Sequence, residues 1–188
     1  MTHHHPKLLA DHIIHLTDAR YYAAAGVEKM VFEPLGGQTR EQAIMYISAL
    51  VEWVEGTEIW LRPNGLLNET DAVSLNVTGV VVPIHEILAW SSNTLRVIVE
   101  ISAEGLQVQD SQEVLWNPGL SIPYEDILNT ILNCSTKIWL SIDPDRADSL
   151  SILDLPAYGF VLQGTREQAT GLKDYSWEEQ ILEHFDKD

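Results

Sequence analysis

Short apolar runs rich in β-branched residues recur along the chain, separated by polar and helix-forming stretches. Most of these runs are continuously apolar and do not alternate, which is typical of parallel strands covered on both faces. The pattern predicts eight strands, at His12–Leu16, Lys29–Phe32, Glu58–Leu61, Val80–Val82, Arg96–Ile101, Val114–Asn117, Lys137–Ile142 and Gly159–Leu162.

Helical signals separate several of these strands. The stretch "DARYYAAAG" ends at Gly26, and glycine is a common residue at the C-terminal end of a helix. "TREQAIMYISALVEWVEG" begins with Thr39 and Gln42 in the spacing of a capping box. "SIPYEDILNTILN" has Ser121 as a candidate cap, and "SWEEQILEHF" has Ser176. Strands that alternate with helices in this way favour a parallel α/β architecture.

Eight strands separated by helices predict a small (β/α)8 TIM barrel, a single domain spanning residues 1–188. Such barrels typically need about 250 residues, so some connections must be shortened. The segment "SAEGLQVQDSQE" is too short and polar for a crossover helix, and we expect a shortened or missing helix between strands 5 and 6. The alternative is an open doubly wound sheet, which would have a glycine-rich turn after its first strand. "HLTDAR" is not such a turn.

Composition narrows the classes of partner. The chain carries 28 acidic and 11 basic residues, a formal charge of −17, which repels nucleic acid and anionic membranes. No apolar run is long enough for a membrane helix, and the start shows no secretory signal. Cys134 has no second cysteine to pair with, so we expect a cytoplasmic protein. We expect it to be either a monomer or a homodimer. His3, His4 and His5 are either native or the remnant of a tag.

The C-terminal segment "GFVLQGTREQATGLKDYSWEEQILEHF" resembles the last βα unit of the phosphoribosylanthranilate isomerase family of tryptophan biosynthesis. That family has a Ser-Gly-Val-Glu-like turn, a Pro-Gly-Ile/Val-Lys-Asp loop and a final helix. The opening "HIIHLT" followed by "DARYYAAAG" resembles its Lys-Ile-Cys-Gly-Leu/Ile-Thr strand and first helix. "MVFEP", "TREQA" and "VVPIH" follow in the family's order. The resemblance spans nearly the whole chain and implies the TIM barrel and a sugar-phosphate isomerase.

Family members carry out an Amadori rearrangement with a cysteine base on the first strand and an aspartic acid at the end of the sixth. Aligned on the motifs above, these positions fall on Ile14 and Asn117. Neither an alkyl group nor an amide exchanges a proton near neutral pH. Cys134 precedes the seventh strand, at the end of the barrel away from an active site. Each acid or base contributes about 10²–10⁴-fold, so we expect the isomerase activity to be lost.

The resemblance also implies a phosphate site, in turns after the seventh and eighth strands. Glycines there let the backbone approach a phosphate closely. Here Ile142 and Asp143 replace one glycine pair, whereas Gly164 remains and is followed by Thr165 and Arg166. A small phosphorylated or anionic ligand therefore stays an expectation, bound through Arg62, His85, Gly164, Thr165 and Arg166.

Polar residues at the predicted strand ends leave two functional classes open. One is an interaction or binding protein on a degenerate barrel. The other is a divergent isomerase, or another sugar-phosphate enzyme, with His12, His15, Glu33 and Asn117 as candidate catalytic residues. Histidine titrates near neutrality, but it is more often a hydrogen-bonded structural residue. The spacing of the histidines matches no metal signature, and we expect no metal and no cofactor.

Overall fold

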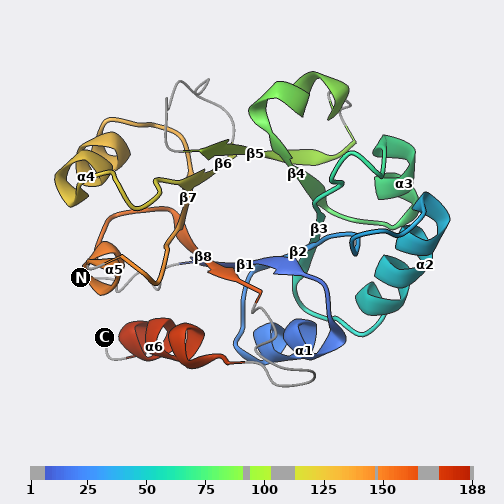
Figure 1. The fold of residues 1–188 in the computed structure, drawn as a ribbon, viewed down its shortest axis with the longest axis horizontal. Coiled ribbons are helices and arrows are strands. Elements are labelled where there is room, and N and C mark those ends of the chain that lie inside the picture. The colour runs from blue at the N-terminus through green and yellow to red at the C-terminus, as the bar shows by residue number, and fades with distance from the viewer. Residues whose placement is uncertain (1–6, 91–93, 103–112, 147, 165–173, 187–188) are drawn as a thin grey trace.

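A computed structural model describes residues 7–90, 94–102, 113–146, 148–164 and 174–186. Eight parallel strands form a closed barrel in chain order, with β8 paired to β1 (Figure 1). The predicted TIM barrel is therefore confirmed. The strands are β1 Lys7–Ile13, β2 Lys29–Phe32, β3 Glu58–Leu61, β4 Gly79–Pro83, β5 Arg96–Ser102, β6 Glu113–Asn117, β7 Ile138–Ser141 and β8 Gly159–Gln163.

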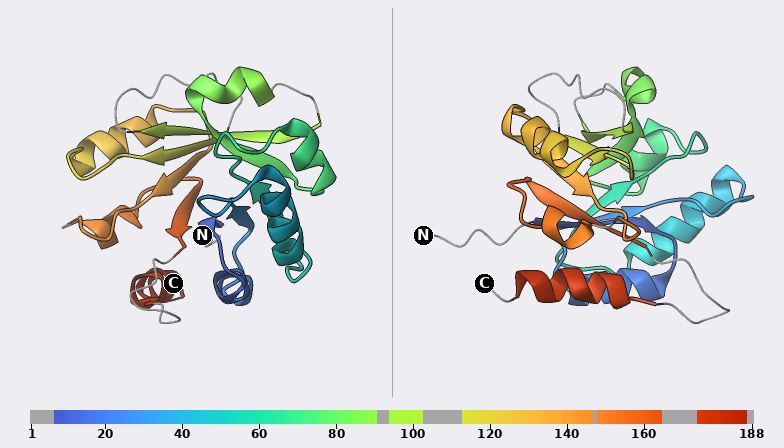
Figure 2. Two further views of the ribbon diagram at one scale, coloured as in Figure 1. Left: turned by 45° about the vertical axis from the view of Figure 1, so that its right-hand side comes forward. Right: turned by 60° about the vertical axis from the view of Figure 1, so that its left-hand side comes forward.

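The helices form an outer ring around this barrel, and several of them are short (Figure 2). They are α1 Leu16–Ala24, α2 Arg40–Val51, α3 Glu69–Ser74, the 3₁₀ helix η1 Ile84–Trp90, α4 Tyr124–Leu132, α5 Ser149–Ile152 and α6 Ser176–Phe185. The shortest of the described helices are α3, η1 and α5, so these connections account for much of the small size of the barrel. Residues 103–112, where we predicted a shortened or missing helix, lie outside the described residues.

The sequence placed most strand bounds within one residue but placed the first strand wrongly. β1 ends at Ile13, and Leu16 already belongs to α1. The polar pair Asp11 and His12 lies inside the true strand, where it interrupts the apolar run that the prediction relied on. The pairing of β1 with β2 is also irregular between Ala10 and Ile13, and His12 has a left-handed φ of 56°.

Two of the predicted caps were misplaced, and one was confirmed. Thr39 accepts a hydrogen bond from the Gln42 backbone, and the Gln42 side chain accepts one from the Thr39 backbone, so the capping box caps α2. That helix ends at Val51, before the expected glycine. The N-cap of α4 is Pro123 and that of α6 is Tyr175, and neither makes a side-chain cap.

A middle layer of eight buried side chains packs inside the barrel, and each strand contributes one of them. Trp60 on β3 and Trp139 on β7 are fully buried and the largest of them. A Cβ at Gly79 would lie 2.5 Å from the Trp60 ring, and a Cβ at Gly159 would lie 2.5 Å from the Trp139 ring. Each indole therefore needs a glycine on the following strand. The layer consists of Leu9, Val31, Trp60, Val81, Ile98, Leu115, Trp139 and Val161.

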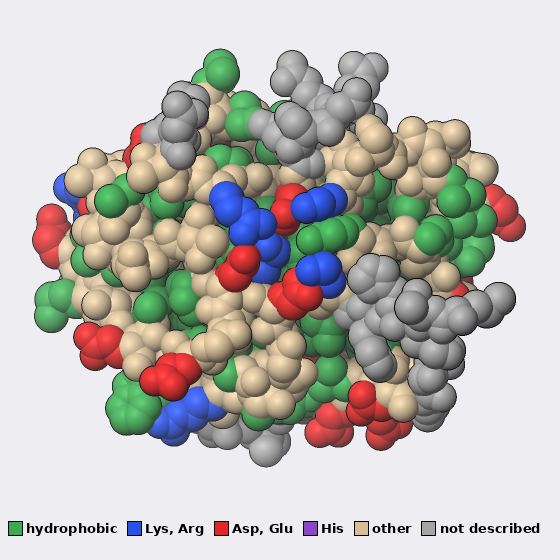
Figure 3. Space-filling model, turned by 180° about the vertical axis from the view of Figure 1, so that it is seen from behind, with side chains coloured by type: hydrophobic (Ala, Val, Ile, Leu, Met, Phe, Trp, Pro, Cys, Tyr) green, Lys and Arg blue, Asp and Glu red, His purple; other side chains and the backbone are tan. Residues whose placement is uncertain are grey.

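Ion pairs close the end of the barrel at the N-termini of the strands. The Lys29 side chain is 3% exposed, and its ammonium lies 4.6 Å from the Trp60 ring centre and pairs with Glu58 at 2.8 Å. Arg96 contacts both Glu58 at 2.9 Å and Glu113 at 3.0 Å. Burial opposes ionisation of Glu58, but hydrogen bonds from Lys29 and Trp60 lower its pKa to about 2. Figure 3 shows lysine, arginine and acidic side chains gathered at the centre of this face.

Within the described residues, no helix is both long and apolar enough to cross a membrane.

Candidate ligand site at the barrel mouth

The strands present polar side chains at their C-terminal ends, where TIM barrels carry their active sites. Alternation from the interior residue Leu9 puts Asp11 at the mouth on β1, and from Ile98 it puts Glu100 there on β5. Glu33 and Arg62 directly follow β2 and β3. These four residues and His12 are the mouth network.

Arg62 is the centre of the mouth network. Its side chain is only 7% exposed, and its two terminal nitrogens lie 2.6 Å from Asp11 Oδ2 and 2.6 Å from Glu100 Oε2. Burial lowers the pKa of Arg62, but the two carboxylates outweigh burial and the net shift is upwards. The guanidinium is therefore permanently charged and already neutralised by two partners. We expected Arg62 to bind an anion, but its position makes it a link between three strands.

His12 and Glu33 form a second pair beside this centre. His12 Nδ1 lies 3.0 Å from Glu33 Oε2, and His12 Nε2 lies 3.6 Å from Asp11 Oδ2. The hydrogen bond to Glu33 raises the pKa of His12, outweighing burial, which lowers it. Burial raises the pKa of Glu33, but hydrogen bonds from His12 and Asn64 lower it, and the net shift is downwards. Each residue therefore favours the charged form of the other: His12 is protonated more readily, and Glu33 loses its proton more readily, than without the partner.

The other predicted histidines lie elsewhere. His15 is the N-cap residue of α1 and makes no side-chain cap. His85 lies on η1, is 76% exposed and faces Glu86 at 3.7 Å. In the part of the chain that the structure describes, no hydrogen bond or ion pair joins either residue to the mouth network, and no group of three or more possible ligands could hold a metal ion. Only His12 of the three takes part in the network.

A pocket of about 480 Å³ opens beside the mouth network, between the ends of β6, β7 and β8 and the start of α6. Asn117 and Gln163 line it, and the Asn117 side chain accepts a hydrogen bond from the Gly119 backbone at 2.9 Å. This is the position where TIM barrels often bind phosphate. The acidic residues that line it are Asp143, Asp145, Asp174 and Glu178.

The charges around this pocket disfavour an anion. Burial raises the pKa of Glu178, and its Oε2 has no hydrogen-bond partner among the described residues. The nearby Arg146 is buried and donates to the carbonyls of Gly119 and Ile122 and to Asp148. Arg146 therefore braces the loops and is not available to a ligand. Thr165 and Arg166, two of the predicted ligand residues, lie outside the described residues.

Gly164 has a structural reason to be glycine. Its backbone nitrogen donates to the Asp11 carbonyl at 2.7 Å. A Cβ at this position would lie 2.4 Å from the carbonyl oxygen of His12, closer than any side chain tolerates. Close packing of β8 on β1 is enough to require glycine here, without any phosphate.

The mouth contains functional candidates that sequence reasoning missed. Asp11 and Glu100 are the partners of Arg62, and neither was predicted. The last inward-facing side chain of β1 is Asp11, whereas Ile14 lies beyond the strand. Correct strand bounds combined with the alternation of side chains would have identified Asp11.

Comparison with known proteins adds a fold but no close relative. No family model and no curated protein sequence matches the chain. Solved structures do match it over nearly its whole length. Phosphoribosyl anthranilate isomerase from Thermus thermophilus has a TM-score of 0.69 and 16% identity, covering 96% of this chain and 98% of its own.

The chain has a phosphoribosylanthranilate-isomerase-like fold. TrpF from Jonesia denitrificans has a TM-score of 0.68 at 16% identity and covers 96% of this chain and 97% of its own. Thiamine phosphate pyrophosphorylase from Pyrococcus furiosus has a TM-score of 0.68 at 11% identity, with 96% and 94% covered. Identities this low establish the barrel and leave the activity open. The fold predicted from the sequence motifs is confirmed.

Proposed function

We propose that this chain is a phosphoribosylanthranilate-isomerase-like barrel that does not catalyse the Amadori rearrangement and binds a small ligand at its mouth. The observation that carries the proposal is the state of the two expected proton-transfer positions. The end of β6 offers the amide of Asn117, and the end of β1 offers Asp11, which is bound at 2.6 Å by Arg62. Both oxygens of Asp11 already accept hydrogen bonds, Oδ1 from the His12 backbone and Oδ2 from Arg62, so the carboxylate is not free to approach a substrate.

The pocket beside the mouth supports the same proposal. The neighbouring structures are named for phosphorylated compounds, whereas this pocket is lined by four acidic residues among those described. Carboxylates repel a phosphate dianion at short range. We infer that any binding of an anion here is weak and depends on Arg166 and Thr165, beside Gly164. A ligand without a phosphate group suits the described lining better.

A second candidate function is supported by the pair of His12 and Glu33. A histidine whose Nδ1 is oriented by a carboxylate is a common general acid or base. His12 is 41% exposed at the mouth, so a substrate could reach it. The strained φ of 56° at His12 is also typical of functional positions. In this alternative the chain is a divergent isomerase, or another enzyme, that uses His12 with Glu33.

Complementation of a tryptophan auxotroph that lacks the isomerase separates the two candidates. We expect no growth without tryptophan from this chain. Growth that is lost in His12→Gln and in Glu33→Gln would overturn the proposal in favour of the divergent isomerase. His85→Gln is the matched control, because His85 is 76% exposed and makes no hydrogen bond or ion pair with the mouth network among the described residues.

A thermal-shift series tests the ligand class. Ribose 5-phosphate and inorganic phosphate are expected to leave the Tm within about one degree of the unliganded value. Stabilisation of several degrees by ribose 5-phosphate that disappears in Arg166→Ala would show that the phosphate site survives.

The cytoplasmic location remains a proposal that rests on the single cysteine.

A further inference from the structure

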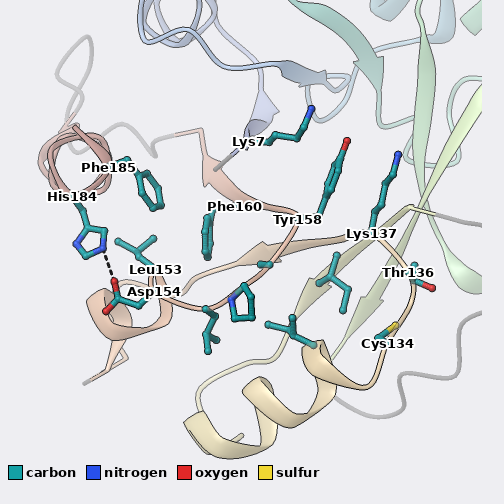
Figure 4. A pocket seen from close by; sticks show the side chains of 15 residues that line it. Lys7, Cys134, Thr136, Lys137, Leu153, Asp154, Tyr158, Phe160, His184 and Phe185 are labelled. Atoms are coloured by element: carbon teal, nitrogen blue, oxygen red, sulfur yellow. Dashed lines mark hydrogen bonds and ion pairs between the residues drawn. The ribbon is translucent and has the colours of Figure 1, made fainter. Parts of the chain in front are cut away.

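Helix α6 lies beside α1 on the outside of the barrel (Figure 1). Its last turn is held by apolar contact, since the Phe185 ring lies 5.4 Å from the Phe160 ring. An ion pair adds to this contact, because His184 lies 3.0 Å from Asp154 (Figure 4). Ile181, in the middle of the helix, is fully buried. The start of α6 is held in a different way, by polar groups buried between α6 and α1.

Glu178 is the central residue of this second contact. It is only 4% exposed, and its Oε2 atom is buried without a hydrogen-bond partner among the described residues. In the part of the chain that the structure describes, no lysine, arginine or histidine forms a hydrogen bond or an ion pair with it. A carboxylate in such surroundings loses its hydration without compensation, so burial favours the protonated form.

The hydrogen bonds of Tyr22 also indicate a proton on Glu178. The Tyr22 hydroxyl donates to the backbone carbonyl of Gln163 at 2.8 Å, and its oxygen lies 3.4 Å from Glu178 Oε1. A hydroxyl has one proton and a carbonyl can only accept, so Gln163 uses that proton. The contact with Oε1 is then favourable only if Glu178 itself carries a proton. The three groups form a chain in which Glu178 donates to Tyr22 and Tyr22 donates to Gln163.

The groups around Glu178 are acidic or aromatic. Asp18 of α1 is fully buried and accepts a hydrogen bond from Tyr175 at 2.7 Å. Burial raises the pKa of Glu178 and outweighs the hydrogen bonds that lower it, and the charges of Asp174 and Asp18 raise it further. Ionisation of Glu178 would therefore place another negative charge beside Asp18 in a buried site. The titratable groups that surround Glu178 are Asp18, Tyr21 and Tyr22 on α1, and Asp174 and Tyr175 before α6.

We propose that the start of α6 detaches from α1 when Glu178 loses its proton. With the proton in place, Glu178 donates to Tyr22 and the helix is docked along its whole length. Without the proton, the buried charge has to reach water, which requires the first turns of α6 to move away from α1. The last turn stays attached through Phe185. The proposal concerns the docking of α6 and is independent of any ligand at the mouth, although Ser176, Trp177 and Glu178 also line the pocket there.

Hydrogen exchange of the α6 amides in the full chain tests the proposal, with wild type and Glu178→Gln compared at the same pH. Glutamine keeps a donor for Tyr22 and cannot ionise, so the variant mimics the protonated state. At pH 8.5 we expect the amides of residues 179–183 to exchange at least about fivefold more slowly in Glu178→Gln than in wild type. The difference should shrink as the pH is lowered to 5.

Thermal unfolding gives a second readout. Because the folded pKa of Glu178 is raised, the stability that this group contributes is present at low pH and is lost as the pH rises through that pKa. Glu178→Gln should therefore raise the Tm by about 2 °C or more at pH 8.5, and by less at pH 5.

Two controls separate this effect from other charges on the helix. Glu179→Gln removes the same charge from the exposed neighbouring position and is expected to change neither the exchange of α6 nor its pH dependence. His184 also needs a proton for its pair with Asp154, and His184→Gln should leave the difference between Glu178 and Gln at position 178 intact. Equal exchange in wild type and Glu178→Gln at pH 8.5, a lower Tm of Glu178→Gln at that pH, or an equal effect of Glu179→Gln would overturn the proposal.

Discussion

Arg62 joins β1, the end of β3 and β5 through two short ion pairs at the centre of the mouth. The arrangement is a structural clamp that ties three strands together. Asp11 is 2% exposed, and Arg62 is the charged group that lies closest to it, at 2.6 Å. Removing one partner of a buried pair costs more than the pair contributes, because the other charge is left without compensation.

Arg62→Met should therefore destabilise the protein by about 3–5 kcal/mol, measured by urea unfolding near pH 7. Arg96→Met is the matched control, since Arg96 also bridges two glutamates but its side chain is 48% exposed. That change should cost about 1 kcal/mol or less. Equal costs for the two variants would contradict the buried clamp.

The His12 and Glu33 pair predicts a pH-dependent effect. The folded pKa of His12 is raised by Glu33, so the resulting stability is present at low pH and is lost as pH rises through that pKa. Glu33→Gln should lower the pKa of His12 in an NMR titration. It should also destabilise the fold near pH 6 by up to about 1 kcal/mol and have little effect at pH 9. A His12 pKa that is unchanged by Glu33→Gln would refute the pairing.

At the level of elements, the sequence predicted most of the barrel because its strands are continuously apolar. β2 and β3 have the predicted bounds, and five others differ by one residue at one or both ends. β1 failed because its polar residues Asp11 and His12 serve the mouth and so break the pattern that identifies a buried strand. The apolar pattern therefore missed β1 because of the two polar residues that this strand contributes to the mouth network. Strand pairing, which a sequence does not display, was needed to place them.

The two tryptophans of the barrel interior make a prediction about the strands that follow them. Gly79→Ala would put a Cβ 2.4 Å from the Arg96 carbonyl oxygen and 2.5 Å from the Trp60 ring, so β4 or the indole must move. We expect a loss of about 1–3 kcal/mol in chemical unfolding. Gly36→Ala is the control, because a Cβ there meets nothing within 4 Å and its φ is not left-handed. Similar stabilities for the two variants would argue against the packing of Trp60 over Gly79.

On the scale of the whole molecule, charge is distributed unevenly. Four of the 11 basic residues, Lys7, Lys29, Arg96 and Lys137, lie at the N-terminal end of the barrel and pair with glutamates there. The formal charge of −17 must then be carried mainly by the rest of the surface. Composition alone gives the net charge. The position of the basic residues could be assigned only from the closed barrel, which brings the first residues of all strands together.

This distribution predicts that added salt stabilises the protein. Repulsion among many separated carboxylates is long-ranged, and 0.5 M NaCl shortens the Debye length to about 4–5 Å and suppresses it. The pairs of Lys29 and Arg62 are screened far less, because both side chains are more than nine-tenths buried and their partners lie within 2.8 Å. The repulsion should therefore weaken more than the attraction.

We expect the Tm to rise by several degrees between 20 mM and 0.5 M NaCl at pH 7.5. The increase should shrink at pH 4.5, where many exposed carboxylates become protonated. A Tm that falls with salt at pH 7.5 would mean that the ion pairs, and not the net charge, dominate the electrostatics of this barrel.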